Sequence, residues 1–174
     1  MDRTRNIFLV GMMGAGKTTI GRQLARRLNK RFVDCDHEIE ARTGVKVPVI
    51  FEIEGEAGFR QREAQIIESL TRETDLILAT GGGAVLDPQN RRHLKERGIV
   101  FYLRVPPRIL YERTRHDRNR PLLQVPDPLG RLESLHADRD PLYRDVADLV
   151  IDGCVGTSGV LRRIEQELGK RCAA

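Results

Sequence analysis

A glycine-rich octapeptide near the N-terminus has the composition of a phosphate-binding loop. Residues 11–18 read Gly-Met-Met-Gly-Ala-Gly-Lys-Thr and fit the pattern G-x-x-x-x-G-K-[ST]. Glycines let such a loop curl so that successive N–H groups face an anion, while Lys17 reaches the outer phosphates and the Thr18 hydroxyl can hold Mg²⁺. A chance glycine-rich turn is the alternative, but the octapeptide follows an apolar run and opens a helical pattern. The pattern therefore predicts binding of nucleotide phosphates.

Two aspartates, Asp34 and Asp36, follow the next predicted strand. Open parallel sheets place their ligand crevice at this edge. One carboxylate could hold the water shell of Mg²⁺, and the other could accept a hydrogen bond from an attacking hydroxyl. An aspartate at this junction could equally be the N-cap of a helix over residues 36–42, which is worth about 1 kcal/mol. The pair alone leaves both interpretations open.

A second glycine-rich turn, Thr80-Gly81-Gly82-Gly83, follows the third predicted strand. It would expose backbone amides at the same edge of the sheet as the phosphate-binding loop. A simple tight turn between a strand and a helix is an equally good interpretation of three glycines taken alone.

Three arginines stand where they could grip an anion. Arg60 lies three residues before Glu63 on a predicted helix, where such pairs are usually solvated and worth a few tenths of a kcal/mol. Arg120 lies in a proline-rich, aperiodic stretch, 115–128, that reads as a lid, and Arg139 begins a segment after the next helix. The planar guanidinium binds phosphate or carboxylate with two bonds. Charge that faces solvent is the alternative.

Five short apolar runs predict the strands that would position these groups. They cover residues 7–10, 32–33, 76–79, 99–103 and 149–151, and helical patterns separate them. One helix has clear ends, since Asp87-Pro88 can open it and Gly98 can close it. We expect an α/β fold of three layers, with a five-stranded parallel sheet flanked by helices in one domain over residues 1–174.

Composition limits the classes of molecule that this protein could bind. The net charge of +5, from 30 Lys and Arg against 25 Asp and Glu, fits nucleic acid, membrane surfaces or acidic metabolites. Aromatics are only 5% with no Trp, and acids alternate with the bases, which disfavours nucleic acid. No apolar run approaches the roughly 20 residues that span a bilayer. We therefore expect neither a nucleic-acid nor a membrane partner.

Cysteine and histidine usage indicates a reducing compartment without a metal cluster. Cys35, Cys154 and Cys172 are odd in number and show no metal-ligand spacing, and the four histidines share none either. Residues 1–6 are charged and lead into a stretch too short for a signal-peptide core. We expect a cytoplasmic protein.

Taken in order, the motifs closely resemble those of the shikimate kinase family, and the resemblance runs along essentially the whole chain. In that family the phosphate-binding loop precedes an acidic D-x-D, an F-R-x-x-E, a G-G-G turn, an R-P-L-L lid and an R-x-P-L-Y segment. Here these elements are residues 34–36, 59–63, 81–83, 120–123 and 139–143. The resemblance implies a P-loop kinase fold, a substrate-binding region at about 34–63 and a mobile lid at about 113–128.

The resemblance also implies a nucleotide site. The residues that would wrap the ATP phosphates are Gly14, Ala15, Gly16, Lys17, Thr18 and Thr19. Mg²⁺ would be held by Thr18, with help from Asp34 through water. Arg120 would cover the phosphates, and Arg113 would stack on adenine. The turn 152–158 lacks the Arg and Pro of some relatives, so adenine contacts would fall to the backbone near Thr157.

On the acceptor side, the resemblance implies that Arg60 and Arg139 grip the carboxylate of shikimate and that Glu63 orients Arg60. Asp36 would hold the attacking hydroxyl, and Gly82 would contact the ring through its backbone. Lys17, Asp36 and Arg120 would then be the catalytic residues. The resemblance also implies that the enzyme is a monomer.

Two alternatives stay open at this stage. Another small-metabolite kinase, such as a gluconate-type kinase, would share the phosphate-binding loop and lid but not the Arg60 and Arg139 pair. A nucleotide-dependent switch or RNA-binding regulator would not need paired aspartates and a lid arginine. Cys35 stands between those aspartates, where we expect a thiol reagent to reach it and block the site by bulk.

Overall fold

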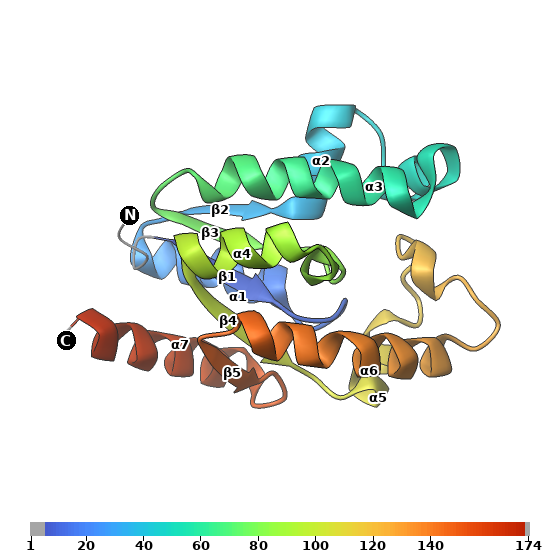
Figure 1. Ribbon diagram of the computed structural model, residues 1–174. Helices are drawn as coiled ribbons and strands as arrows, with labels where there is room; N and C mark the ends of the chain where they lie inside the picture. The colour runs from blue at the N-terminus through green and yellow to red at the C-terminus, as the bar shows by residue number, and fades with distance from the viewer. Residues whose placement is uncertain (1–5, 173–174) are drawn as a thin grey trace.

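A five-stranded parallel sheet forms the centre of the molecule (Figure 1). The computed structural model describes residues 6–172. In sheet order the strands are β2 (Arg31–Asp34), β3 (Leu76–Ala79), β1 (Ile7–Val10), β4 (Ile99–Arg104) and β5 (Leu149–Asp152). From β1 the chain crosses to β2 on one side and later reaches β4 on the other. Parallel sheets bind ligands at the carboxyl end of the strand where this order reverses.

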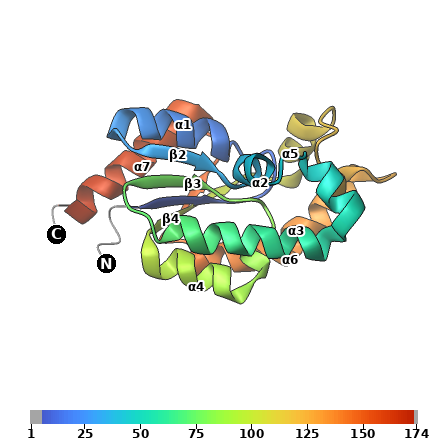
Figure 2. The ribbon, with the colours of Figure 1, turned by 90° about the horizontal axis from the view of Figure 1, so that it is seen from above.

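Helices cover both faces of the sheet. They are α1 (Lys17–Leu28), α2 (Cys35–Thr43), α3 (Val47–Thr71), α4 (Pro88–Arg97), α5 (Pro107–Thr114), α6 (Pro128–Val146) and α7 (Gly156–Cys172), with 3₁₀ turns η2 (Ala84–Leu86) and η3 (Pro121–Leu123). Figure 2 shows α1 and α7 on one face and α3, α4 and α6 on the other. The predicted three-layer α/β fold with a five-stranded parallel sheet is confirmed.

The strands lie where the apolar runs predict them, because side chains of β1 and β3 are buried on both faces of the sheet. Three of the predicted strands are longer in the structure by one residue or two at their ends. Asp87 caps α4 as expected, since its Oδ1 accepts a 2.7 Å hydrogen bond from the N–H of Gln89, and Gly98 ends the helix.

Two predicted boundaries are wrong. Arg139 does not begin a new segment but lies inside α6, which continues through Pro141. The proline suggested a break because it lacks a backbone N–H, yet the helix tolerates it there. Residues 152–158 are not all a turn either, since α7 already begins at Gly156 and includes Thr157.

One end of the sheet brings distant segments together. Residues 115–127 lie opposite the first turns of α3, beyond the carboxyl ends of the strands (Figures 1 and 2). Within α3 the helix is broken at Gly55, whose φ of 69° and ψ of −178° are not helical. This break lets residues 47–54 turn toward the lid, while the rest of α3 packs on the sheet.

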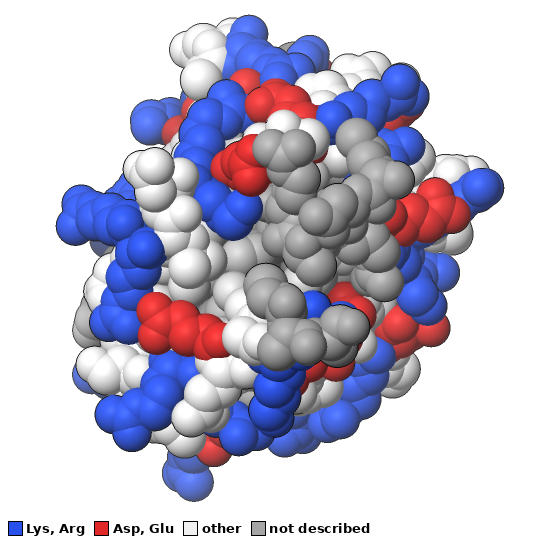
Figure 3. Space-filling model, turned by 90° about the vertical axis from the view of Figure 1, so that its left-hand side faces the viewer, with Lys and Arg blue, Asp and Glu red and all other residues white. Residues whose placement is uncertain are grey.

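Charge is mixed on the face that carries the two ends of the chain. Figure 3 shows Lys and Arg side chains spread around this face with Asp and Glu side chains among them. Within residues 6–172, no helix is long and apolar enough to cross a membrane.

Candidate active site

The phosphate-binding loop joins β1 to α1 and depends on glycine at two close approaches. Gly11 has a φ of 146° and Gly14 a φ of 80°. A Cβ on Gly11 would lie 2.6 Å from the carbonyl oxygen of Leu103, and a Cβ on Gly14 would lie 2.7 Å from the methyl of Thr114. Gly16 is the N-cap of α1 and offers no side-chain cap. The first N–H groups of α1 are thereby left for an anion.

Lys17 is held inside this loop. Its Nζ donates to the carbonyl oxygens of Gly11 at 2.7 Å and Met12 at 2.8 Å, and the side chain is buried. Burial, helped by the positive charge of Arg120, lowers the pKa of Lys17 to about 8. The ammonium is therefore mostly protonated at pH 7, and its buried charge favours a phosphate as partner.

Both carboxylate oxygens of Asp34 accept hydrogen bonds. Its Oδ1 accepts hydrogen bonds from the backbone N–H groups of Asp36 at 3.0 Å and His37 at 3.3 Å, so it is the N-cap of α2. Its Oδ2 accepts a 2.5 Å hydrogen bond from the hydroxyl of Thr18. The helix-cap interpretation is thus correct for Asp34, and the second oxygen points to the phosphate-binding loop.

The pair of Thr18 and Asp34 has the chemistry that Mg²⁺ prefers. Both present hard oxygens, and Mg²⁺ on a nucleotide takes few protein ligands and keeps phosphate oxygens and waters for the rest. Among the described residues there is no cluster of three or more His, Cys, Asp or Glu side chains that could hold a metal ion. The donor set therefore fits a nucleotide-bound Mg²⁺ rather than a metal held by the protein alone.

A cleft of about 430 Å³ runs over the phosphate-binding loop, and a smaller hollow of about 60 Å³ opens beside it. Gly14, Gly16, Lys17, Thr18 and Thr19 line the cleft, whereas the side chain of Ala15 packs in the core. The smaller hollow is lined by residues from α3, α6 and the lid, among them Arg60 and Arg139. Asp36, Gly82 and Arg120 line both spaces, so the two spaces meet there.

Half-buried Arg60 pairs with a fully buried Glu63, whereas a solvated pair is expected of most helical neighbours. Nη1 of Arg60 donates a 2.8 Å hydrogen bond to Oε1 of Glu63, whose side chain is fully buried. Burial raises the pKa of Glu63 to about 7, and nearby Asp36 also raises it, against the lowering effect of Arg60. Glu63 thus fixes Arg60 through this hydrogen bond, and Arg60 lines the hollow.

Four charged side chains around the smaller hollow have buried polar atoms without a hydrogen-bond partner. The atoms are Oδ1 of Asp36, Nε of Arg60, Oε2 of Glu63 and Nη1 of Arg139. Buried polar groups are nearly always paired in native proteins. Two guanidinium donors beside a free carboxylate oxygen would suit a ligand that has both a carboxylate and a hydroxyl.

The turn of three glycines is the floor of this hollow. A Cβ on Gly81 would overlap Oε2 of Glu63, and a Cβ on Gly83 would overlap the Arg60 guanidinium. At Gly82 a Cβ would lie 3.4 Å from Nη1 of Arg139. The glycines are thus needed for the close approach of the charged groups, which is more than a tight turn requires.

The remaining predicted residues are Arg120 in the lid, and Arg113 and Thr157, which do not line the cleft. Arg120 lies at the junction of the two spaces, where its Nε donates a 3.0 Å hydrogen bond to Oδ2 of Asp117. Arg113 donates to the carbonyl oxygens of Gly14 at 3.1 Å and Gly153 at 3.5 Å. Arg113 thereby joins the phosphate-binding loop to the turn after β5. Thr157 is half-buried in the first turn of α7.

Cys35 is less accessible than we expected, and Asp117 is a site residue that we did not expect. Cys35 is fully buried, and burial raises the pKa of its thiol, so a thiol reagent does not reach it in the folded protein. Asp117 lines the phosphate cleft and pairs with Arg120, a role that the sequence interpretation missed. Its spacing of three residues before Arg120 is the signal that could have indicated it.

The fold and this site define a P-loop kinase with an acceptor pocket for a small anion. The family model for shikimate kinase matches residues 13–168, nearly the whole chain. The chain therefore belongs to the shikimate kinase family.

Individual shikimate kinases match this chain over nearly its whole length. The chain is 66% identical over 163 residues to a shikimate kinase of Aromatoleum aromaticum, with 93% of each chain covered. It is 61% identical to one of Dechloromonas aromatica, covering 98% of this chain and 93% of the relative. A structure of shikimate kinase from Acinetobacter baumannii in complex with shikimate superposes with a TM-score of 0.94 at 50% identity, covering 97% of this chain and 94% of that one.

A gluconokinase from Sinorhizobium meliloti 1021 is similar in fold alone. Its TM-score is 0.59 at 15% identity, covering 98% of this chain and 94% of that one. This likeness shows a shared fold and does not bear on the acceptor.

Proposed function

We propose that this protein transfers the γ-phosphoryl group of ATP to the 3-hydroxyl of shikimate, giving shikimate 3-phosphate and ADP in aromatic amino acid biosynthesis. The observation that carries the proposal is the hollow in which buried, unpartnered atoms of Arg60, Arg139 and Asp36 converge beside the phosphate cleft. Shikimate has one carboxylate for the two arginines and a hydroxyl for the aspartate. Family membership supports the same substrate.

On the acceptor side, Arg60 and Arg139 bind the carboxylate through charged hydrogen bonds, and Glu63 keeps Arg60 in place. Gly82 contacts the ring with its backbone. Asp36 accepts the hydrogen bond of the 3-hydroxyl. Burial and the charge of Asp34 raise the pKa of Asp36, so its carboxylate retains an accepted proton better than an exposed aspartate would.

On the nucleotide side, residues 14–19 surround the phosphates with backbone N–H groups and the Lys17 ammonium. Thr18, with help from Asp34 through water, would hold Mg²⁺, which when bound neutralises charge on the phosphate oxygens. Arg113 and the backbone near Thr157 face the adenine. The support is position, since Arg113 touches the phosphate-binding loop and the turn that precedes α7.

Transfer is a direct in-line displacement. The 3-hydroxyl oxygen forms the new bond to the γ-phosphorus as the bond to the bridging oxygen of ADP breaks, and the hydroxyl proton passes to Asp36. Lys17 and Arg120 neutralise the charge on the γ-phosphoryl group during transfer. The lid, residues 113–128, closes over the site and excludes water, which prevents wasteful hydrolysis of ATP.

The wider setting follows the sequence expectations. We propose one catalytic domain over residues 1–174, with residues 34–63 as the acceptor-binding region. The enzyme acts as a monomer in the cytoplasm, with no nucleic-acid or membrane partner. The cysteine pattern and the mixed surface charge support this setting.

The test is ADP release from the purified protein with Mg-ATP and shikimate, gluconate, AMP or no acceptor. We expect release that depends on shikimate. If only another acceptor responds, the kinase chemistry stands but the roles of Arg60 and Arg139 are wrong. If no acceptor responds while ATP binds, transfer to a small molecule is refuted.

A further inference from the structure

Tyr143 is a buried polar side chain of α6 that the mechanism above does not use. Its hydroxyl donates a hydrogen bond to the carbonyl oxygen of Gly82, 61 residues away in the chain. We propose that this hydroxyl positions both the Gly82 peptide and Arg139 for the acceptor, so that Tyr143 is a positioning residue of the site. The inference rests on the proposed function, because Gly82 and Arg139 are acceptor contacts only if that function is correct.

The hydroxyl links two separate elements. Tyr143 follows Arg139 by four residues on α6, so the two side chains lie on the same face of the helix. Burial raises the pKa of Tyr143 well above its usual value, while the charge of the neighbouring Arg139 acts in the opposite direction. The hydroxyl thus stays protonated at neutral pH. It donates to the carbonyl oxygen of Gly82, the residue whose turn lies against Arg139.

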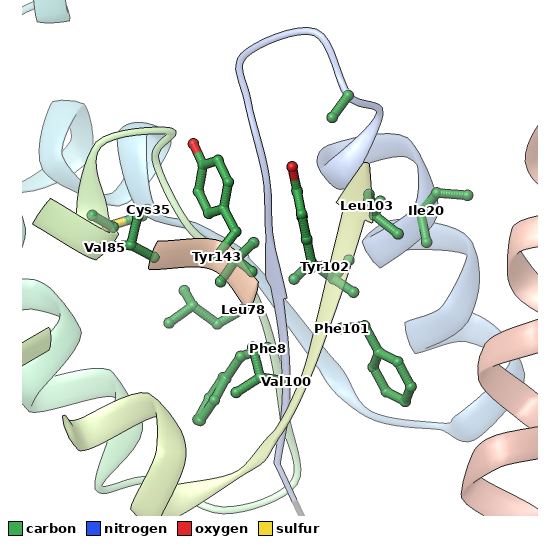
Figure 4. Close-up of a cluster of buried hydrophobic side chains, with 14 of the residues drawn as sticks. Phe8, Ile20, Cys35, Leu78, Val85, Val100, Phe101, Tyr102, Leu103 and Tyr143 are labelled. Atoms are coloured by element: carbon green, nitrogen blue, oxygen red, sulfur yellow. The ribbon is translucent and has the colours of Figure 1, made fainter. Parts of the chain in front are cut away.

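The ring of Tyr143 is fixed by its packing against a second tyrosine. It packs against the ring of Tyr102 on β4, with centroids 4.8 Å apart and planes tilted by 34°. The Tyr102 hydroxyl donates to Oδ1 of Asp140 at 2.7 Å, and Arg144 donates to the other oxygen of Asp140 at 2.8 Å. Figure 4 shows the two tyrosines side by side, with both hydroxyls at the end away from Phe8 and Val100. Tyr143 is therefore fixed by packing and presents only its hydroxyl to the turn.

A fixed donor matters at this turn because glycine has little conformational preference of its own. Gly81, Gly82 and Gly83 have no Cβ to restrict their dihedral angles, and their peptide planes can rotate more freely than those of other residues. A hydrogen bond to the Gly82 carbonyl sets the direction of that peptide plane. It also keeps the turn against Arg139, whose Nη1 lies 3.4 Å from where a Cβ of Gly82 would be. Loss of the hydroxyl should therefore disturb the acceptor pocket and leave the phosphate-binding loop unchanged.

The test is Tyr143→Phe, which removes the hydroxyl and keeps the ring. We expect the Kd and KM for shikimate to rise about tenfold or more, because the Gly82 carbonyl is left without its donor. The Kd and KM for ATP should stay within about twofold. Binding is measured by titration calorimetry at low temperature. For shikimate, saturating ADP is present, because a bound nucleotide keeps a destabilised variant folded.

Tyr102→Phe is the matched control. It removes the hydroxyl from the other ring of the pair and loses the bond to Asp140, but not the one to Gly82. It should lower the melting temperature while the Kd for shikimate changes less than about threefold.

Three results would overturn the inference: Tyr143→Phe with wild-type affinity for shikimate, equal losses for shikimate and ATP, or an equal shikimate loss in Tyr102→Phe. If the wild-type protein neither binds nor phosphorylates shikimate, the proposed function fails first, and that outcome is seen before any variant is compared.

Discussion

Glu63→Gln should remove a pH dependence from the stability of the protein. The wild-type carboxyl is fully buried, and burial raises its pKa from an ordinary value of 4.5 to about 7. The folded state therefore binds this proton more tightly than the unfolded chain does. The stabilisation from the bound proton is complete below pH 4.5 and is lost as the pH rises to 7 and above. Glutamine has nearly the same shape and has no proton to lose.

The size of the effect follows from the difference between the two pKa values. One pKa unit corresponds to 1.36 kcal/mol, so the full loss between low and high pH is about 3 kcal/mol. From pH 5 to pH 8 the free energy of unfolding of the wild type should fall by about 2.5 kcal/mol relative to Glu63→Gln. The variant also loses the charge that pairs with Arg60, which shifts its whole curve, so only the change with pH carries the prediction.

Urea unfolding of both proteins at pH 5, 6, 7 and 8 measures the difference curve. Glu56→Gln is the control, since Glu56 contacts the same arginine at 3.2 Å from an exposed position. A flat difference curve for Glu63→Gln would refute the argument that burial of this carboxyl dominates its protonation.

Three further variants test the proposed site. Lys17→Met should abolish turnover and leave the circular dichroism spectrum unchanged, whereas near-normal activity would exclude the phosphate-binding loop from the chemistry. Arg139→Ala should weaken shikimate binding by about tenfold or more in calorimetry, because a substrate carboxylate loses a charged partner, with little change for ATP; equal losses would contradict its role. Asp36→Asn should lower kcat by about a hundredfold with an unchanged Kd for ATP, and a wild-type rate would rule out proton acceptance by Asp36.

Short-range patterns predicted the fold and the strand, loop and helix that contain residues 7–28. The sheet depends on short apolar runs, and the phosphate-binding loop depends on eight consecutive residues between β1 and α1. Both are set by neighbours in the chain, so their sequence signal is local. Asp34 could be interpreted as a helix cap or as a partner of the metal, and the structure shows why local patterns could not choose. One of its oxygens caps α2 while the other bonds to Thr18.

The acceptor side was less predictable because its character comes from tertiary contacts. Spacing made Arg60 and Glu63 neighbours, but tertiary contacts such as the close approach of Gly81 bury Glu63, and burial raises its pKa. Arg139 was placed in the wrong element because Pro141 mimics a helix break. The motif resemblance named these residues, whereas burial and pairing became visible only in three dimensions.

The unpartnered atoms of the acceptor hollow bear on how the site achieves affinity. Arg139 is only 2% exposed and Glu63 is fully buried, so folding has already removed most of their contact with water. The free-energy cost of ordering these side chains and removing their water is therefore not incurred again when a ligand carboxylate binds there. The cost appears instead in the free protein, as the raised pKa values of Asp36 and Glu63. If Arg60 and Arg139 bind a carboxylate as proposed, the site should discriminate against neutral analogues, because an analogue without that group would leave Nε of Arg60 and Nη1 of Arg139 without a partner.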